Sequence, residues 1–124
     1  MTVMPTDLAT RLKDPSLLVT QAYIHGAWTE GTGGTYPVLN PARGDVIAEV
    51  ADLTRADVAG AIAAAEAAQK GWAARTAKER SGILRRWFEL MMESQEDLAV
   101  ILTAEQGKPL PEAMGEIAYG ASFV

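Results

Sequence analysis

The chain has 124 residues, a formal net charge of −5 at pH 7 and 48% hydrophobic residues. This composition provides enough apolar side chains for a folded core and argues against wholesale disorder. The acidic balance argues against nucleic-acid binding, because contacts with phosphates require clustered Lys and Arg. The absence of cysteine excludes disulfides, thiolate metal sites and a cysteine nucleophile within these residues.

No segment approaches the roughly 18 apolar residues that a membrane span needs. The stretch from Met1 to Asp14 contains no apolar run of signal-peptide length. We therefore expect a cytoplasmic protein that does not bind membranes.

Residues 1–20 are expected to form an N-terminal leader that contains one short helical turn. The turn would cover Asp7 to Leu12, with Thr6 as its cap. Pro15 would prevent the helix from continuing.

Residues 21–52 are expected to form short strands joined by tight turns. The extended runs are 22–25, 27–29, 35–39 and 46–51. Gly26 separates the first two runs, which predicts a hairpin. The Asn, Pro and Gly residues of Asn40–Asp45 are typical of a turn. Residues 46–51 alternate between apolar and polar, which predicts a half-buried strand.

Four helices are expected in the second half of the chain. Their expected ranges are 54–72, 76–92, 94–106 and 109–124. Thr54 and Thr76 each stand three residues before an acidic residue, a pattern typical of a capping box. Gly107 is expected to end the third helix.

Apolar residues recur three or four positions apart in these helices, which predicts a buried face on each. The predicted buried residues are Val58, Ile62, Ala65, Ile83, Leu84, Trp87, Leu90, Met91, Leu98, Ile101 and Leu102. The last apolar pattern continues to Val124 without the Gly, Asn or basic residue that usually ends a helix. We therefore expect the chain to be a piece of a larger protein.

Three features resemble functional motifs, and the sequence favours a structural interpretation of each. The Gly31–Gly34 stretch lacks the spacing and the strand-to-helix context of a phosphate loop, which predicts a flexible loop. His25 has no second metal ligand beside it, so we expect an exposed side chain. Glu112 and Glu116 lie one helical turn apart, which is the spacing of a pair of catalytic carboxylates. The same spacing is typical of a solvated helix face, which is the favoured interpretation.

Several segments together resemble the N-terminal part of aldehyde dehydrogenases. The matching segments are Tyr23–Trp28, Asn40–Ile47, Trp72 with Thr76–Arg80, and Glu105–Ala113. They follow the family's order and spacing, and the resemblance covers about residues 16–124. Three further segments look most like bacterial succinate-semialdehyde dehydrogenases, namely Thr76–Met92, Leu102–Leu110 and Gly115–Phe123.

The resemblance implies an α/β fold of the aldehyde dehydrogenase type, present only in part. It implies a small β-hairpin region followed by four helices, with residues 21–124 as the N-terminal part of an incomplete domain. The parent enzyme would oxidise succinate semialdehyde to succinate with NAD or NADP, in 4-aminobutyrate degradation. It would act as a homo-oligomer, either a dimer or a tetramer.

Members of this family use a cysteine nucleophile and a glutamate-activated water. The resemblance implies that these residues and the cofactor contacts come after residue 124, and this chain has no cysteine. The resemblance therefore supplies no catalytic or cofactor-binding residue here. We therefore expect the chain alone to be inactive and to bind no cofactor.

The resemblance does supply candidate residues for two other sites. The backbone carbonyls of Val38 and Leu39 and the Glu105 carboxylate correspond to ligands of a monovalent cation, since hard cations prefer oxygen. Tyr119 and Phe123 lie on the helix that lines the substrate tunnel of relatives. The alternative interpretations are a surface glutamate and ordinary core aromatics.

Two other functions stay open at this point. The chain can be a fragment of a glutarate-semialdehyde or other aldehyde dehydrogenase. It can also be a non-catalytic helical module that binds a partner. The sequence does not distinguish NAD from NADP.

Overall fold

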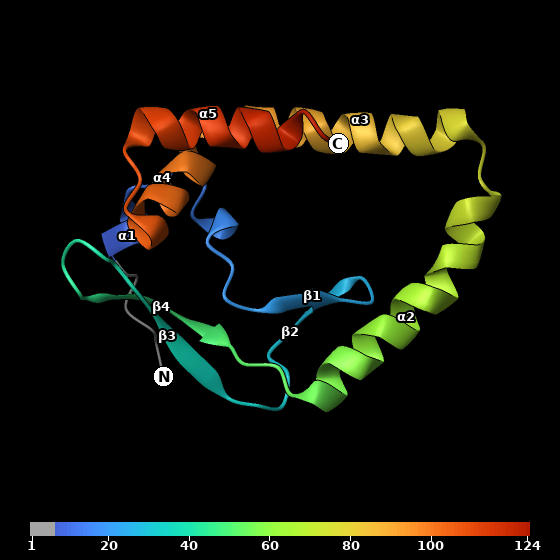
Figure 1. Cartoon of the computed structure of the whole chain (residues 1–124), viewed down its shortest axis with the longest axis horizontal. Helices are drawn as coiled ribbons and strands as arrows, with labels where there is room; N and C mark the ends of the chain where they lie inside the picture. Colours follow the sequence, from blue (N-terminus) through green and yellow to red (C-terminus); the bar gives the residue numbers. More distant parts are fainter. Residues whose placement is uncertain (1–6) are drawn as a thin grey trace.

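The computed structural model describes residues 7–124, so the expected Thr6 cap lies outside the described residues. The elements are α1 (Asp7–Thr10), η1 (Pro15–Leu17), β1 (Ala22–Ile24), β2 (Ala27–Thr29), β3 (Thr35–Leu39), β4 (Val46–Ala51), α2 (Arg55–Ala74), α3 (Ala77–Glu93), α4 (Gln95–Gln106) and α5 (Leu110–Ala121). Two strand pairs are followed by four helices (Figure 1). This order confirms the predicted fold class.

The first hairpin pairs β1 with β2 in antiparallel register through a two-residue turn. His25 and Gly26 occupy that turn with φ values of 51° and 77°. Two successive positive φ values are those of a type I′ turn, whose twist matches the twist of the strands. His25 is exposed, as predicted. It lies in the turn, however, and not in the extended run 22–25 that the sequence predicted, because β1 ends at Ile24.

The second hairpin pairs β3 with β4 across the Asn40–Asp45 turn. The Asn40 side chain accepts a hydrogen bond from the Ala42 amide at 2.9 Å, and Gly44 has a φ of 77°. Both features are turn chemistry that the sequence predicted.

A β-bulge interrupts this second hairpin. Val38 lies opposite Ala48 and Leu39 lies opposite Val46, so Ile47 is an extra residue. Ile47 and Ala48 are consequently both buried, at 3% and 6% exposure. The predicted alternation of buried and exposed residues is therefore wrong at this point of β4.

Capping boxes begin both long helices, as predicted. The Thr54 side chain accepts a hydrogen bond from the Asp57 amide at 3.3 Å, and the Asp57 carboxylate accepts one from the Thr54 amide at 2.8 Å. Thr76 and Glu79 make the same reciprocal pair at the start of α3. These bonds satisfy amides that the first turn of a helix leaves free.

The junction between α4 and α5 follows the sequence signals with a small difference. Gly107 ends α4 in the left-handed region, with a φ of 82°. Pro109 is the residue before α5, and the helix ends at Ala121 rather than continuing to Val124.

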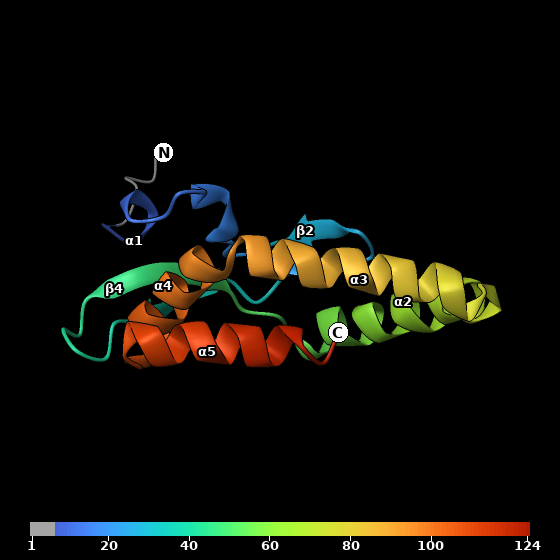
Figure 2. The same cartoon turned by 90° about the horizontal axis from the view of Figure 1, so that it is seen from above.

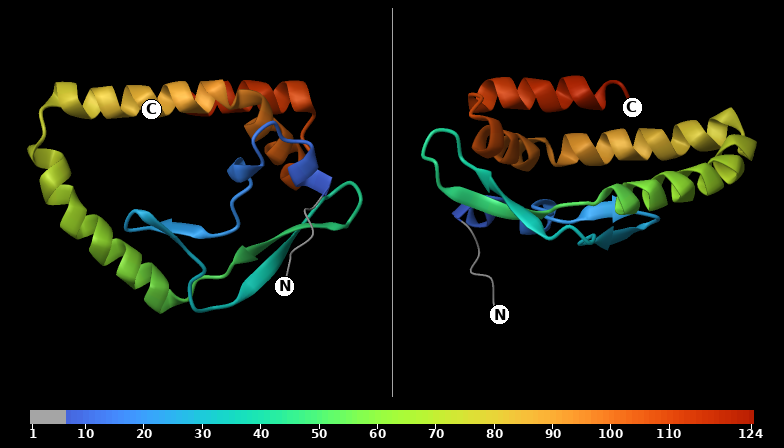
Figure 3. Two further views of the ribbon diagram at one scale, coloured as in Figure 1. Left: turned by 180° about the vertical axis from the view of Figure 1, so that it is seen from behind. Right: turned by 60° about the horizontal axis from the view of Figure 1, so that its bottom comes forward.

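The core is small and lies between the N-terminal segment, β4 and α4. Leu8, Ile47 and Ala104 form its centre. Figures 2 and 3 show α5 beside α3, and α5 also packs on α4. Ala99 of α4 and Ala113 of α5 both have 0% exposure. Short side chains at these positions let the helices approach closely.

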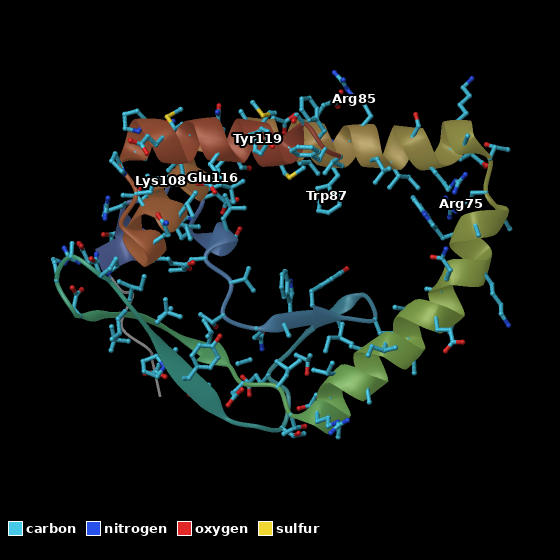
Figure 4. The ribbon with its side chains drawn as sticks, in the orientation of Figure 1. Arg75, Arg85, Trp87, Lys108, Glu116 and Tyr119 are labelled. Carbon is cyan, nitrogen blue, oxygen red and sulfur yellow. The ribbon has the colours of Figure 1, made fainter. Side chains whose placement is uncertain are left out.

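The helical spacing predicted buried apolar faces on α2 and α3, and this burial is not present in the chain, as is expected of a piece of a larger protein. Neither helix has a buried residue. Ile62 is 64% exposed and Trp87 is 55% exposed, and Figure 4 shows Trp87 projecting away from α3. The helical period identifies which face is apolar, but it does not say what covers that face. In α4 the fully buried residues are Asp97, Ala99 and Ala104, whereas Leu98, Ile101 and Leu102 are only half-buried.

None of the helices between residues 7 and 124 is long and apolar enough to cross a membrane.

Candidate functional site

A shallow hollow of about 290 Å³ lies between the β3–β4 pair and the last turn of α4. It is lined by Val19, Thr20, Gln21, Ala22, Tyr36, Val38, Val50, Ala51 and Glu105. Two of the three predicted cation ligands, Val38 and Glu105, therefore lie at one hollow. Leu39 is at the bulge, 49% exposed, and is not part of this wall.

The chemistry of the hollow suits a cation only in part. The Glu105 carboxylate lies near the C-terminal end of α4, where the helix dipole also attracts positive charge. The Thr20 carbonyl already accepts a hydrogen bond from the Ala51 amide at 2.8 Å. Within residues 7–124 no three His, Cys, Asp or Glu side chains are grouped to hold a metal. A cation here would depend on backbone carbonyls, and this assignment stays a prediction.

The two predicted tunnel residues form an exposed aromatic pair at the end of α5. The rings of Tyr119 and Phe123 meet edge to face with centroids 4.8 Å apart. The two residues are 67% and 72% exposed, so they are not core aromatics in this chain; Figure 4 labels Tyr119 on α5. Their placement along a substrate tunnel stays a prediction.

The two glutamates of α5 are not a catalytic pair. Glu116 forms an ion pair with Lys108, which lies in the turn before the helix (Figure 4). Glu112 is exposed. The ion pair joins the middle of α5 to the α4–α5 turn, and this geometry indicates a structural role.

The glycine-rich loop is tethered rather than flexible. The Asp57 carboxylate accepts hydrogen bonds from the amide and the hydroxyl of Thr32, at 3.0 and 2.8 Å. Bonds from the Thr54 and Thr32 side chains and amides lower the pKa of Asp57 to about 2. The loop is therefore fixed against the beginning of α2.

A loop that binds the phosphates of a dinucleotide needs backbone amides that are free to donate hydrogen bonds to them. The amide of Gly31 donates to the Thr29 hydroxyl at 3.2 Å, and the amide of Gly33 donates to the Asp52 carbonyl at 3.0 Å. The Thr32 amide between them is bonded to Asp57. A phosphate cradle needs free, convergent amides, so the loop does not fit a nucleotide cofactor.

One structurally important residue escaped the sequence analysis. Asp97 is only 6% exposed and accepts hydrogen bonds from the amides of Lys13 and Asp14, at 3.0 and 2.9 Å. These two bonds lower the pKa of Asp97. Lys13 also forms an ion pair with Glu96. The only available signal was that Asp97 shares a helical face with buried Ala104.

Comparisons with known proteins identify relatives of this chain. The profile of the aldehyde dehydrogenase family matches residues 28–124. A glutarate-semialdehyde dehydrogenase of Pseudomonas putida is 56% identical over 115 residues, which cover 92% of this chain and 24% of that protein. A succinate-semialdehyde dehydrogenase [NADP(+)] of Escherichia coli is 50% identical over 115 residues, with the same coverage.

The fold has solved counterparts as well. The crystal structure of an aldehyde dehydrogenase from Brucella melitensis superposes with a TM-score of 0.89 at 53% identity. The match covers 91% of this chain and 24% of that structure. The chain therefore spans about a quarter of the length of the relatives that it matches.

Proposed function

This chain belongs to the aldehyde dehydrogenase family, and on that premise we propose that it is the N-terminal part of an NAD(P)-dependent semialdehyde dehydrogenase. The observation that supports this most directly is the match of 92% of the chain to a quarter of a semialdehyde dehydrogenase. In the parent enzyme, residues 21–124 would begin the dehydrogenase domain and residues 1–20 would form its leader.

We propose succinate semialdehyde as the substrate, with glutarate semialdehyde as the alternative. The relatives at 56% and 50% identity are named for glutarate and succinate semialdehyde. Another, at 54%, is named for 3-sulfolactaldehyde. The first two substrates carry an aldehyde at one end and a carboxylate at the other. The parent would convert the aldehyde, NAD(P)⁺ and water into the acid, NAD(P)H and a proton, and would assemble as a homo-oligomer.

The residues of this chain do not hold the cofactor in that proposal. Relatives in the family bind NAD(P)⁺, but the glycine-rich loop here has its amides bonded within the protein. The sequence also has no cysteine to act as the nucleophile. The cofactor contacts and the reacting groups would come from the other three quarters of the parent.

A chimera tests this proposal. The corresponding first quarter of the Pseudomonas putida enzyme would be replaced by this chain, and NAD(P)H formation would be measured with succinate and glutarate semialdehyde. We expect activity comparable to that of the unmodified enzyme, and none from the same enzyme without its first quarter. A chimera that assembles and melts like the parent but oxidises neither aldehyde would refute the proposal. Aldehyde-dependent NAD(P)H formation by the 124-residue chain alone would also contradict it.

The exposed apolar faces of α2 and α3 favour a second candidate, a non-catalytic module that binds a partner through its helices. Such a module should unfold cooperatively as an isolated chain. A gradual thermal melt, together with recovery of no partner in a pull-down, would count against it.

A further inference from the structure

The chain exposes more surface than a compact protein of its mass. Its accessible area is 8736 Å², whereas a folded monomer of this mass exposes about 6,400 Å². The excess is about 2,300 Å². Obligate complexes bury roughly 1,000–2,500 Å² on each partner. The excess therefore has the size of one obligate interface.

Apolar residues on the two long helices account for part of this surface. Val58 and Ile62 lie four residues apart on α2, and Ile83, Trp87 and Leu90 are spaced by four and three residues on α3. All five are between 45% and 64% exposed. We call these five residues the α2–α3 stripes.

The α2–α3 stripes are not the surfaces that the chain uses for its own packing. The side of α3 toward the end of α5 carries Leu84 and Phe88, which line a hollow together with Ala121. The helix α2 extends away from α3 and α5, and none of its residues is buried (Figures 1 and 3). The stripes are therefore open to another molecule without any rearrangement of the chain.

We propose that the α2–α3 stripes bind the part of an aldehyde dehydrogenase polypeptide that follows this segment in its relatives, and that binding needs no covalent link. This inference rests on the proposed function. The relatives carry about three quarters of their length outside the matched segment, which is enough chain to cover an interface of this size. The five exposed side chains are apolar, so an apolar surface would cover them at the lowest desolvation cost.

The conformation of the isolated segment supports binding without a link. The chain superposes on its solved relative with a TM-score of 0.89 over 91% of its length. The projecting helix α2 belongs to that common arrangement, although no other described element packs extensively on it. A segment that already has its bound shape loses less conformational entropy on association.

The experiment mixes the purified 124-residue chain with the Pseudomonas putida glutarate-semialdehyde dehydrogenase that lacks its matching first quarter. Sedimentation measures association, and NAD(P)H formation with glutarate semialdehyde measures the recovered activity. We expect a one-to-one association of the two polypeptides and aldehyde oxidation that neither shows alone.

Two variants test whether the α2–α3 stripes make the contact. Ile62→Glu and Trp87→Ala change exposed side chains, so each should keep the circular dichroism spectrum of the free chain. Each should weaken association by about thirtyfold, as loss of an interface anchor does. The matched control is Ala67→Glu, which places the same charge on α2 about 140° around the helix from Ile62. The control should bind like the unmodified chain.

The outcomes separate the two proposals. If the covalent chimera is active but the mixed polypeptides do not associate, binding without a link is wrong and the proposed function stands. If the chimera assembles and melts like the parent but is inactive, the proposed function fails, and this inference, which rests on it, fails with it. If the chain sediments as a dimer that Ile62→Glu dissociates, the stripes bind a second copy and this inference is overturned. Equal weakening by Ala67→Glu and Ile62→Glu would also overturn it.

Discussion

Replacement of Gly33 by alanine should destabilise the chain strongly, because the new Cβ would lie only 2.4 Å from the Asp52 carbonyl oxygen. Two hydrogen bonds prevent the segment before β3 from moving away from the segment after β4. The Gly33 amide donates to the same carbonyl at 3.0 Å, and the Asp52 amide donates to the Gly34 carbonyl at 2.9 Å. Overpacking costs about 1–3 kcal/mol and a lost hydrogen bond about 1 kcal/mol more. We expect the free energy of unfolding to fall by about 2–4 kcal/mol.

Urea unfolding followed by far-ultraviolet circular dichroism measures this change. With the slopes usual for small proteins, the unfolding midpoint should fall by about 1–3 M. Gly60→Ala is the matched control, because a Cβ at Gly60 meets no atom within 4 Å. It should stabilise α2 by about 0.5–1 kcal/mol. If Gly33→Ala shifts the midpoint no further down than Gly60→Ala does, the close approach of Gly33 to Asp52 is not real.

Three further predictions concern the helix ends and their packing. Thr54→Ala and Thr76→Ala should each cost about 1 kcal/mol of stability, measured by urea unfolding, and Thr54→Ala should cost more because Thr54 also bonds Thr32. The pKa of Asp97 is lower in the folded chain, so its stabilisation is present above the unfolded pKa of about 4 and is lost as the pH falls below it. Asp97→Asn should remove this part of the pH dependence in parallel acid titrations, and identical titration curves would contradict the assignment. Ala113→Leu should overpack the α4–α5 contact and lower the melting temperature at a cost of about 1–3 kcal/mol, and an unchanged melt would show that the two helices are not in close contact.

The features that the sequence predicts well depend on neighbours in the chain. The capping boxes at Thr54 and Thr76 and the turn at Asn40–Asp45 need only residues two to five positions apart. The Gly107 helix end is likewise local, because only the backbone of that residue must take a positive φ. Local steric and hydrogen-bonding rules are therefore sufficient for the order and type of the elements.

The features that the sequence does not predict depend on distant partners. The Asp97 anchor requires amides that are 83 and 84 residues away, and the bulge at Ile47 requires the register of the opposite strand. The exposure of Trp87 depends on what packs against α3. Two of the three proposed cation ligands meet at one hollow, but that pairing came from a family resemblance and not from any local rule.

The anchoring of the N-terminal segment by Asp97 also sets an order of events during synthesis. The amide of Lys13 and its carboxylate partner are 84 residues apart, so the segment leaves the ribosome long before its partner exists. At the usual elongation rate of about 5–20 residues per second, the delay is roughly 4 to 17 s. The two hairpins and α2 close over short chain distances, so their elementary folding steps are much faster than that interval. The N-terminal segment is thus among the first parts of the chain to be made and among the last to fold.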